Sequence, residues 1–309
     1  MADDKTKLQT LASVLDGLMQ RYRERVPDVD RAIKAMIRSG IVADANEIEN
    51  DHIAFRTMGV PQLGVQSLEK IFLHLGYAKR DRYDFPAKKL NAWWYSPPEN
   101  RFPRIFISEL RVDDLSAEAG RIIRSYTDEV AHDPVSEINQ DELAIDSFLH
   151  RPLWRTPTLS DYLRLEQESE YAAWVIYNRY YLNHFTISVH NLPDGFNTIE
   201  QFNLFLETNG LKLNDSGGKA KTSGDGLLIQ SSTVAQMVDA TFDDGNGGKV
   251  IHRISGSYVE FAERRVMPGQ EGESGLKADR AKRRDGFEAN NADKIFESTY
   301  SQQTSRDMS

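Results

Sequence analysis

The first fifty residues carry apolar side chains with the period of an α-helix. They recur every three or four residues at Leu8, Leu11, Leu15, Leu18 and Tyr22. A second run with the same spacing follows Pro27. Side chains at this spacing share one face of a helix, and a proline inside such a run ends it. The pattern therefore predicts two amphipathic helices within residues 1–48.

From residue 50 the pattern changes to short runs that are rich in β-branched and aromatic residues. The runs are "HIAFRTM", "AKRDRYDF", "NAWWYS" and "RIFISELRV", and clusters of Pro, Lys and Asn separate them. A helical run at about 64–76 follows the first of them. Such runs are typical of strands. Residues 50–112 are therefore expected to form a β-α-β-β-β module.

The same order of elements is predicted a second time, after a mainly helical segment at 113–182. The strand pattern resumes with "NHFTISVH", and the helical run "NTIEQFNLFLETNG" comes next. Three further strands are expected, at about 223–233, 236–243 and 249–264, with the turn "DDGNGG" between the last two. Residues 183–265 thus form a second β-α-β-β-β module, and a polar C-terminal segment covers 266–309.

The two predicted modules place matching residues at matching positions. Each first strand begins with a histidine, His52 or His184, and each last strand carries a glutamate, Glu109 or Glu260. Similarity at a fixed interval indicates an internal repeat. We therefore predict an α+β fold in which both modules form one open, barrel-like mixed sheet. Helical additions at the N-terminus and centre complete a single catalytic domain over residues 1–309.

Composition narrows the chemistry that this fold can carry. The chain has 38 basic and 47 acidic residues and a net charge of -9, which argues against nucleic acid or an anionic membrane as partner. It contains no cysteine, so a metal would have to be held by His, Asp or Glu. The oligomeric state does not follow from composition.

Two features of the sequence bear on location. The N-terminus is acidic from its third residue and helical in pattern, unlike a signal or transit peptide. No apolar run reaches the roughly 18 residues that a membrane span needs. We therefore expect a cytoplasmic protein.

The two histidines and a glutamate form a candidate metal site. A single strand histidine is more often structural, but His52 and His184 hold equivalent positions in the repeat. Two imidazoles and one carboxylate suit ferrous iron and leave positions for a 2-oxo acid and O2. Glu109 and Glu260 compete for the carboxylate role. Glu260 is preferred because its module also supplies His184.

Arg56 is the candidate for substrate binding, since alternate residues of a strand share one face. Its planar guanidinium suits the distal carboxylate of a dicarboxylic substrate in an otherwise acidic protein. The alternative is an ion pair with a buried carboxylate of the protein. Ser188 and Tyr258 share the strand faces of His184 and Glu260 and are weaker candidates.

The paired modules resemble the vicinal oxygen chelate superfamily. More closely, "DHIAFRT", "NHFTISVH", "YVEFAER" and "IFEST" resemble the 2-oxoadipate dioxygenase/decarboxylase family, also called hydroxyglutarate synthases. The resemblance extends over about residues 10–300. It implies conversion of 2-oxoadipate and O2 into 2-hydroxyglutarate and CO2 on Fe(II), in lysine degradation.

The resemblance also implies roles for individual residues. His52, His184 and Glu260 would be the iron ligands, with both histidines beside the substrate. Arg56 would hold the far carboxylate of the substrate.

This chain departs from the bacterial members of that family near its C-terminus. Those members are longer before the closing motif and carry a Val-Ser pair there that contacts the substrate. This chain has Asn290 and Asn291 at that place, so these two are weak candidates for substrate binding.

Two other functions stay open at this point. One is a different vicinal oxygen chelate metalloenzyme, such as an isomerase or lyase acting on a small 2-oxo or 2-hydroxy acid. The other is a metal-free module that binds a ligand. The metal content of the purified protein distinguishes the metal-free module from the enzymes. Oxygen uptake distinguishes the dioxygenase from the isomerase or lyase.

Overall fold

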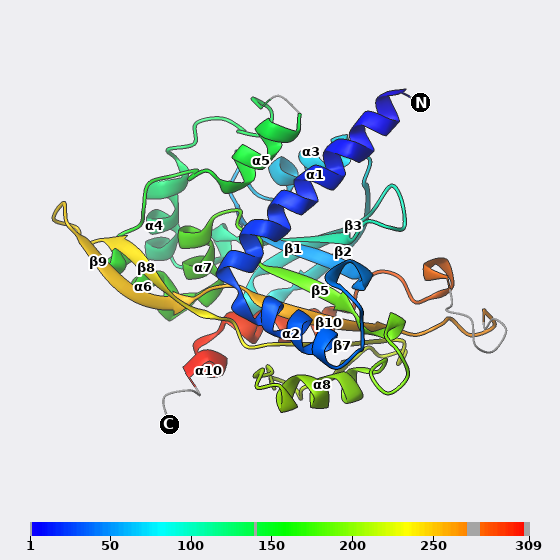
Figure 1. Ribbon diagram of the computed structural model, residues 1–309. Helices are drawn as coiled ribbons and strands as arrows, with labels where there is room; N and C mark the ends of the chain where they lie inside the picture. The colour runs from blue at the N-terminus through cyan, green and yellow to red at the C-terminus, as the bar shows by residue number, and fades with distance from the viewer. Residues whose placement is uncertain (1, 139–140, 271–278, 306–309) are drawn as a thin grey trace.

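One large curved sheet with helices around it forms the body of the protein (Figure 1). The computed structural model describes residues 2–138, 141–270 and 279–305. The predicted N-terminal helices are present as α1 (Ala2–Arg25) and α2 (Pro27–Arg38). Pro27 occupies the first turn of α2, where its missing N–H costs nothing. No helix in the described ranges has the length and apolar character to cross a membrane.

The first module has the predicted order of elements. They are β1 (Asn50–Gly59), α3 (Val65–His74), β2 (Ala78–Phe85), β3 (Leu90–Ser96) and β4 (Arg104–Arg111). A helical segment follows, with α4 (Ala117–Thr127), α5 (Glu142–His150), α6 (Leu159–Glu168) and α7 (Glu170–Asn178).

The second half contains more strands than predicted. Its elements are β5 (His184–Ser188), α8 (Ile199–Thr208), β6 (Lys221–Thr222), β7 (Leu228–Ser232), β8 (Met237–Asp243), β9 (Lys249–Ser255) and β10 (Tyr258–Arg264). The helices α9 (Ala289–Phe296) and α10 (Ser301–Thr304) follow.

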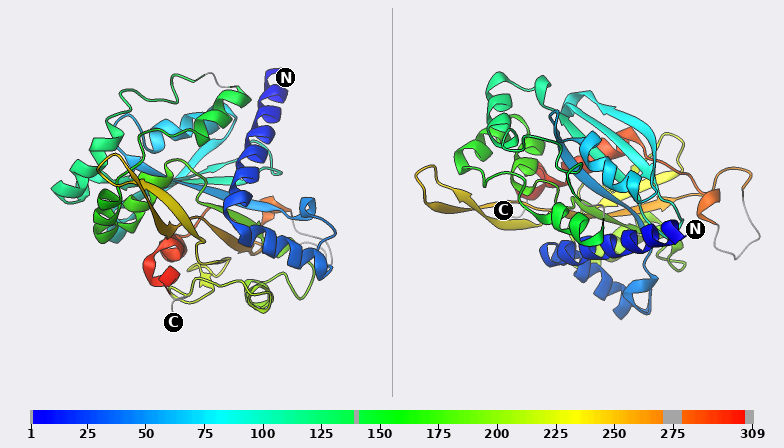
Figure 2. Two further views of the ribbon diagram at one scale, coloured as in Figure 1. Left: turned by 60° about the vertical axis from the view of Figure 1, so that its left-hand side comes forward. Right: turned by 90° about the horizontal axis from the view of Figure 1, so that it is seen from above.

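The prediction of one strand over 249–264 was wrong. Strands β8 and β9 form a separate two-stranded sheet that projects from the body (Figures 1 and 2). The chain leaves this hairpin at Gly256, whose carbonyl accepts a bond of 2.8 Å from the Trp174 indole. The Gly256 N–H donates back to the Gln236 carbonyl over 2.7 Å. These bonds replace ladder bonds and end β9 before β10 begins.

The large sheet has the strand order β2-β3-β4-β1-β5-β10-β7-β6. Strand β1 pairs with β4 in parallel, and β5 pairs with β10 in parallel. The two halves meet where β1 and β5 run antiparallel. Each half thus repeats the same arrangement outward from the centre. The predicted α+β fold with an open, barrel-like mixed sheet is confirmed.

The two faces of the sheet have different coverings. On one face, Phe55 packs against Phe72 of α3 with ring centroids 5.5 Å apart, and Phe261 packs against Phe202 of α8 at 5.3 Å. Helix α9 contacts β2 near one edge of the sheet and β6 at the other. Helix α9 therefore covers the face that carries the predicted site.

Candidate metal centre

Three predicted side chains converge on the covered face of the sheet. His52, His184 and Glu260 come from β1, β5 and β10, which are neighbours in the sheet. The Nε2 atoms of the histidines are 3.3 Å apart. Glu260 Oε1 lies 3.3 Å from Nε2 of His52, and Oε2 lies 3.1 Å from Nε2 of His184. All three side chains are buried.

These spacings fit a single divalent cation. Two donor atoms bound at about 2.2 Å and at right angles to each other lie about 3.1 Å apart. Two imidazoles and one carboxylate on one face of an ion are the donor set of non-haem ferrous enzymes. Within the described ranges, no other group of three or more His, Asp or Glu residues has its ligand atoms close enough together to hold one ion.

The charges of the three groups also suit a cation. Burial lowers the pKa of His184 to about 3, so this imidazole is neutral. Burial would raise the pKa of Glu260, but the two histidines hold it below its usual value. Burial would lower the pKa of His52, but Glu260 and Asp51 raise it. The site therefore presents an ionised carboxylate beside the neutral imidazole of His184.

Asp51 fixes the orientation of His52. Its Oδ1 lies 2.8 Å from Nδ1 of the imidazole, which turns Nε2 toward Glu260. Arg264 donates to the Asp51 carboxylate from Nε over 2.7 Å and from Nη2 over 2.9 Å. Arg104 Nη1 donates to Asp51 Oδ2 over 3.3 Å. Burial would raise the pKa of Asp51, but the two arginines hold it well below its usual range. An ionised outer carboxylate of this kind orients a metal-binding histidine.

The residue before the other histidine has a similar position. Asn183 Oδ1 lies 3.2 Å from Nδ1 of His184. The sequence interpretation missed both Asp51 and Asn183. The signal was present, because each predicted first strand has an oxygen-bearing side chain directly before its histidine.

We expect Asp51→Asn to weaken metal binding by about 10- to 100-fold, as the loss of such outer partners usually does. The asparagine keeps the shape but loses the charge that holds the imidazole. Titration of the metal-free protein with Fe(II) under argon measures the change. Asp285→Asn is the matched control, since Asp285 pairs with Arg104 at 2.5 Å but does not contact His52. Equal affinities in both variants would refute the orienting role.

The strand register corrects the proposed equivalence of Glu109 and Glu260. In the second half, Glu260 pairs with Thr186, two residues after the histidine. The matching pair in the first half is Phe106 with Ala54. An aromatic ring therefore occupies the place of the carboxylate, and only the second half places a carboxylate beside the two histidines.

The true counterpart of Glu109 is Glu263. Glu109 accepts a bond of 2.9 Å from the N–H of Val65, the first residue of α3. Glu263 accepts a bond of 2.9 Å from the N–H of Ile199, the first residue of α8. A carboxylate at a helix N-terminus satisfies a free N–H and interacts favourably with the helix dipole. The repeat thus conserves a structural role between its two halves.

Glu109→Ala and Glu263→Ala should each lower the free energy of unfolding by about 1 kcal/mol, the usual effect of losing a helix cap. Chemical denaturation measures this loss. Fe(II) affinity should stay as in the unsubstituted protein, because neither carboxylate lies in the group formed by His52, His184 and Glu260. Loss of metal binding in Glu109→Ala would instead return Glu109 to the list of ligands.

Arg56 is buried near the three converging side chains, without a carboxylate partner in the described part of the chain. Its Nη1 donates to Thr299 Oγ1 over 2.9 Å, and its Nη2 donates to the Phe296 carbonyl over 3.0 Å. The guanidinium carbon lies 5.1 Å from the ring centroid of Tyr171 and 5.2 Å from that of Trp174. Nε has no partner. The alternative prediction, an ion pair with a buried carboxylate, is not found among these residues.

A small cavity of about 20 Å³ opens onto His52, His184 and Glu260. Its walls are His52, Phe106, His184, Gln230, Tyr258, Glu260, Phe287, Ala292, Ile295 and Phe296. This space holds about one water molecule. Tyr258 stacks on His184 with ring centroids 4.9 Å apart, so this weak candidate does lie in the site. Burial raises the pKa of Tyr258, and Arg56 opposes that rise.

The other weak candidates lie farther away. Asn291 donates to Gln230 Oε1 over 3.1 Å, and Gln230 Nε2 donates to Glu260 Oε1 over 2.6 Å. Asn291 therefore reaches the site through Gln230, which the sequence interpretation missed. Asn290 is exposed. Ser188 bonds to Glu49 Oε1 over 3.3 Å and does not line the cavity.

Comparisons with known proteins point to one enzyme family. Residues 14–275 match the family model described as 2-oxoadipate dioxygenase/decarboxylase. The chain is 42% identical, over 95% of its length and 78% of the relative's, to the chloroplastic 2-oxoadipate dioxygenase/decarboxylase of Arabidopsis thaliana. A rice relative, named chloroplastic/amyloplastic, is 43% identical over 95% of this chain and 80% of its own.

A solved structure gives the same result for the fold. The crystal structure of the hydroxyglutarate synthase from Oryza sativa in complex with 2-oxoadipate superposes with a TM-score of 0.87. The match covers 97% of this chain and 95% of that chain, with 42% sequence identity.

Proposed function

The chain belongs to the 2-oxoadipate dioxygenase/decarboxylase family, and on that basis we propose that it converts 2-oxoadipate and O2 into 2-hydroxyglutarate and CO2 with Fe(II). In this reaction the substrate loses one carboxyl group as CO2. The shortened acid receives both oxygen atoms, one in its new carboxylate and one in its hydroxyl group. The observation that carries the proposal is the convergence of His52, His184 and Glu260 beside the buried Arg56.

Fe(II) held by His52, His184 and Glu260 would supply the electrons and open positions that O2 activation requires. The protein prepares the ligands for this ion. Burial keeps His184 neutral, and Asp51 fixes the ring of His52. The bond from Gln230 leaves Glu260 Oε2 free to face His184.

Arg56 would hold the distal carboxylate of the substrate. A buried guanidinium without a carboxylate partner is unfavourable, and a dicarboxylic substrate supplies the missing negative charge. The flat rings of Tyr171 and Trp174 fix the plane of the guanidinium, so its N–H groups can meet a carboxylate in two parallel bonds. This fixed arginine would set the length of acid that reaches the metal.

The C-terminal segment would have to move for the substrate to enter. The cavity of about 20 Å³ is too small for a six-carbon acid. Phe287 packs on His52 with centroids 4.7 Å apart, and Phe296 of α9 also lines the cavity. We propose that this segment opens for entry and then excludes water around the reacting groups.

The direct test is to incubate the ferrous protein with 2-oxoadipate under 18O2. We expect CO2 and 2-hydroxyglutarate that carries two labelled oxygen atoms, with one O2 consumed for each CO2 released. Complete iron loading without turnover of 2-oxoadipate or a neighbouring 2-oxo acid would reject the proposal. Turnover without O2 uptake would indicate an isomerase or lyase instead.

Lysine degradation and a cytoplasmic location are also proposals for this chain. The two plant relatives are named chloroplastic, which applies to those proteins. Deleting the gene and measuring 2-oxoadipate during growth on lysine tests the first. Fractionation of cells tests the second.

A further inference from the structure

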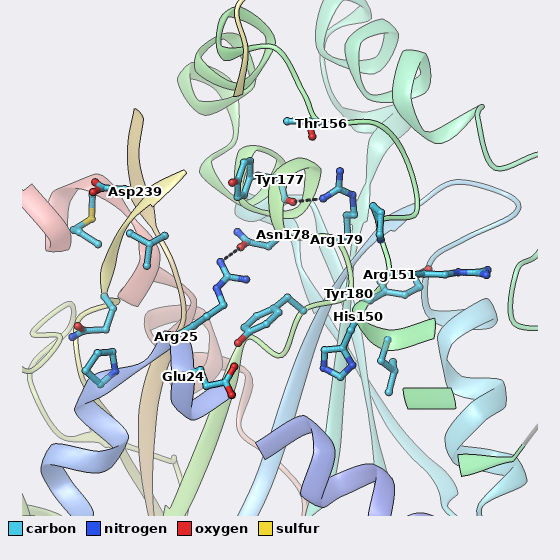
Figure 3. Close-up of a pocket in the computed structure, with 17 residues that line it drawn as sticks. Glu24, Arg25, His150, Arg151, Thr156, Tyr177, Asn178, Arg179, Tyr180 and Asp239 are labelled. Carbon is cyan, nitrogen blue, oxygen red and sulfur yellow. Dashed lines mark hydrogen bonds between the residues drawn. The ribbon is translucent and has the colours of Figure 1, made fainter. Parts of the chain in front are cut away.

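A second, larger cavity has its own set of lining residues (Figure 3). Its volume is about 650 Å³, within the range of sites for small molecules. It lies between the end of α1, the segment 177–181 and the start of β8. Its lining residues differ from those of the metal cavity. The mechanism proposed above makes no use of it.

The charges around this cavity favour an anion. Three arginines line it, Arg25, Arg151 and Arg179, against the two carboxylates of Glu24 and Asp239. Both carboxylates and Arg151 are exposed, whereas Arg25 and Arg179 are half-buried. His150 also lines the cavity, and burial lowers its pKa, which keeps it neutral. A local excess of positive charge is unusual in a chain whose net charge is -9.

Arg25 is held in place as a ready-made anion contact. Its Nη2 donates to Asn178 Oδ1 over 2.8 Å, and its guanidinium carbon lies 4.0 Å from the ring centroid of Tyr181. Figure 3 shows the side chain reaching from α1 toward Asn178. Arg25 has no carboxylate partner in the described ranges. A planar guanidinium held in this way is suited to carboxylate and phosphate groups.

Arg179 also lines the cavity, and hydrogen bonds to backbone carbonyls hold its side chain in place. Its Nη1 donates to the Tyr177 carbonyl over 3.0 Å, and its Nη2 donates to the Trp154 carbonyl over 2.7 Å. Its φ of 58° is rare for a residue with a side chain, and such strain is common at ligand sites. Backbone carbonyls, without a carboxylate, thus hold a second guanidinium at the cavity.

We propose that this cavity is a second ligand site, for a small organic anion that Arg25 binds through a carboxylate or phosphate group. The charge excess, the fixed guanidinium and the volume all favour this class of ligand. The binding itself does not depend on the reaction at the metal centre.

The walls of this cavity are connected, through the chain and through hydrogen bonds, to residues around the proposed metal centre. The segment 177–181 joins α7, whose Trp174 lies against Arg56, to β5, which begins with His184. Gln236 in the opposite wall accepts from Gly256, which in turn accepts from the Trp174 indole. We therefore expect an anion in this cavity to change the affinity for substrate at Arg56. This coupling rests on the proposed function, whereas the site does not.

Calorimetric titration of the protein with citrate, pyrophosphate and inorganic phosphate tests the site. At least one of these anions should bind with one-to-one stoichiometry. The anion with the highest affinity shows whether the site prefers carboxylate or phosphate. Arg25→Met should weaken that binding by about tenfold or more, the usual loss for a bond to a charged group. Arg23→Met is the matched control, because Arg23 is on the same helix but pairs with the exposed Asp30.

Arg56→Met separates this site from the catalytic one, since the anion should still bind that variant with its original affinity. A cooperative thermal unfolding transition shows that each variant is folded. If Arg25→Met is unfolded, Arg151→Met provides the second test. The proposal would be overturned if none of the three anions bound. It would also be overturned if Arg25→Met and Arg151→Met both bound the anion as well as the unsubstituted protein, or if only Arg56→Met lost binding. Failure of turnover with 2-oxoadipate would not affect these titrations.

Discussion

Glu260→Gln is expected to lower Fe(II) affinity by more than about a hundredfold and to abolish oxygen consumption with 2-oxoadipate. Loss of an outer partner typically costs 10- to 100-fold in metal affinity, and a direct ligand should cost more. The amide keeps the size of the side chain but removes the single negative charge among the three proposed ligands. Both quantities can be measured by anaerobic Fe(II) titration followed by an oxygen electrode.

Glu263→Gln is the matched control for this experiment. Glu263 lies on the same strand, is also buried and contacts the start of α8 instead of His52 and His184. It should retain Fe(II) binding and turnover. A Glu260→Gln protein that bound iron and consumed oxygen normally would show that another group supplies the carboxylate.

Arg56→Met should weaken the binding of 2-oxoadipate by about a hundredfold or more and leave Fe(II) affinity unchanged. Two bonds to a charged group each contribute about 1.5–3 kcal/mol, and methionine keeps the apolar stem between Tyr171 and Trp174. Binding should be measured without oxygen, so that affinity is separated from turnover.

The monocarboxylic analogue 2-oxohexanoate provides the internal control for Arg56. The unsubstituted protein should prefer 2-oxoadipate over this analogue, and Arg56→Met should lose the preference because the two acids differ only at the distal end. Equal losses of substrate and metal binding would indicate that Arg56 mainly holds Thr299 and the C-terminal segment in place. Thermal unfolding of the variant would then show a corresponding loss of stability.

The grouping of His52, His184 and Glu260 was largely predictable because the fold repeats itself. His52 and His184 stood out as equivalent residues of two first strands, and the alternation of side chains placed Arg56 on the same face as His52. Such periodic signals are local, so they can be followed in a sequence. The central pairing of β1 with β5 then brings the two histidines together.

What could not be predicted depends on strand register. The sequence suggested that Glu109 and Glu260 were equivalent, but the pairing of β1 with β4 places Phe106 where Glu260 lies in the other half. Gln230 was missed for a related reason, since nothing in a buried strand indicates which neighbour an amide will meet. The extra hairpin of β8 and β9 depended on the bonds of Gly256 with Trp174 and Gln236. These contacts join segments that are distant in sequence.

The most direct test is anomalous diffraction at the iron edge from crystals grown without oxygen in the presence of Fe(II) and 2-oxoadipate. The account predicts one strong peak within bonding distance of His52, His184 and Glu260, with the substrate between that peak and Arg56. A peak bound by other residues, or a substrate whose distal carboxylate lies away from Arg56, would contradict it.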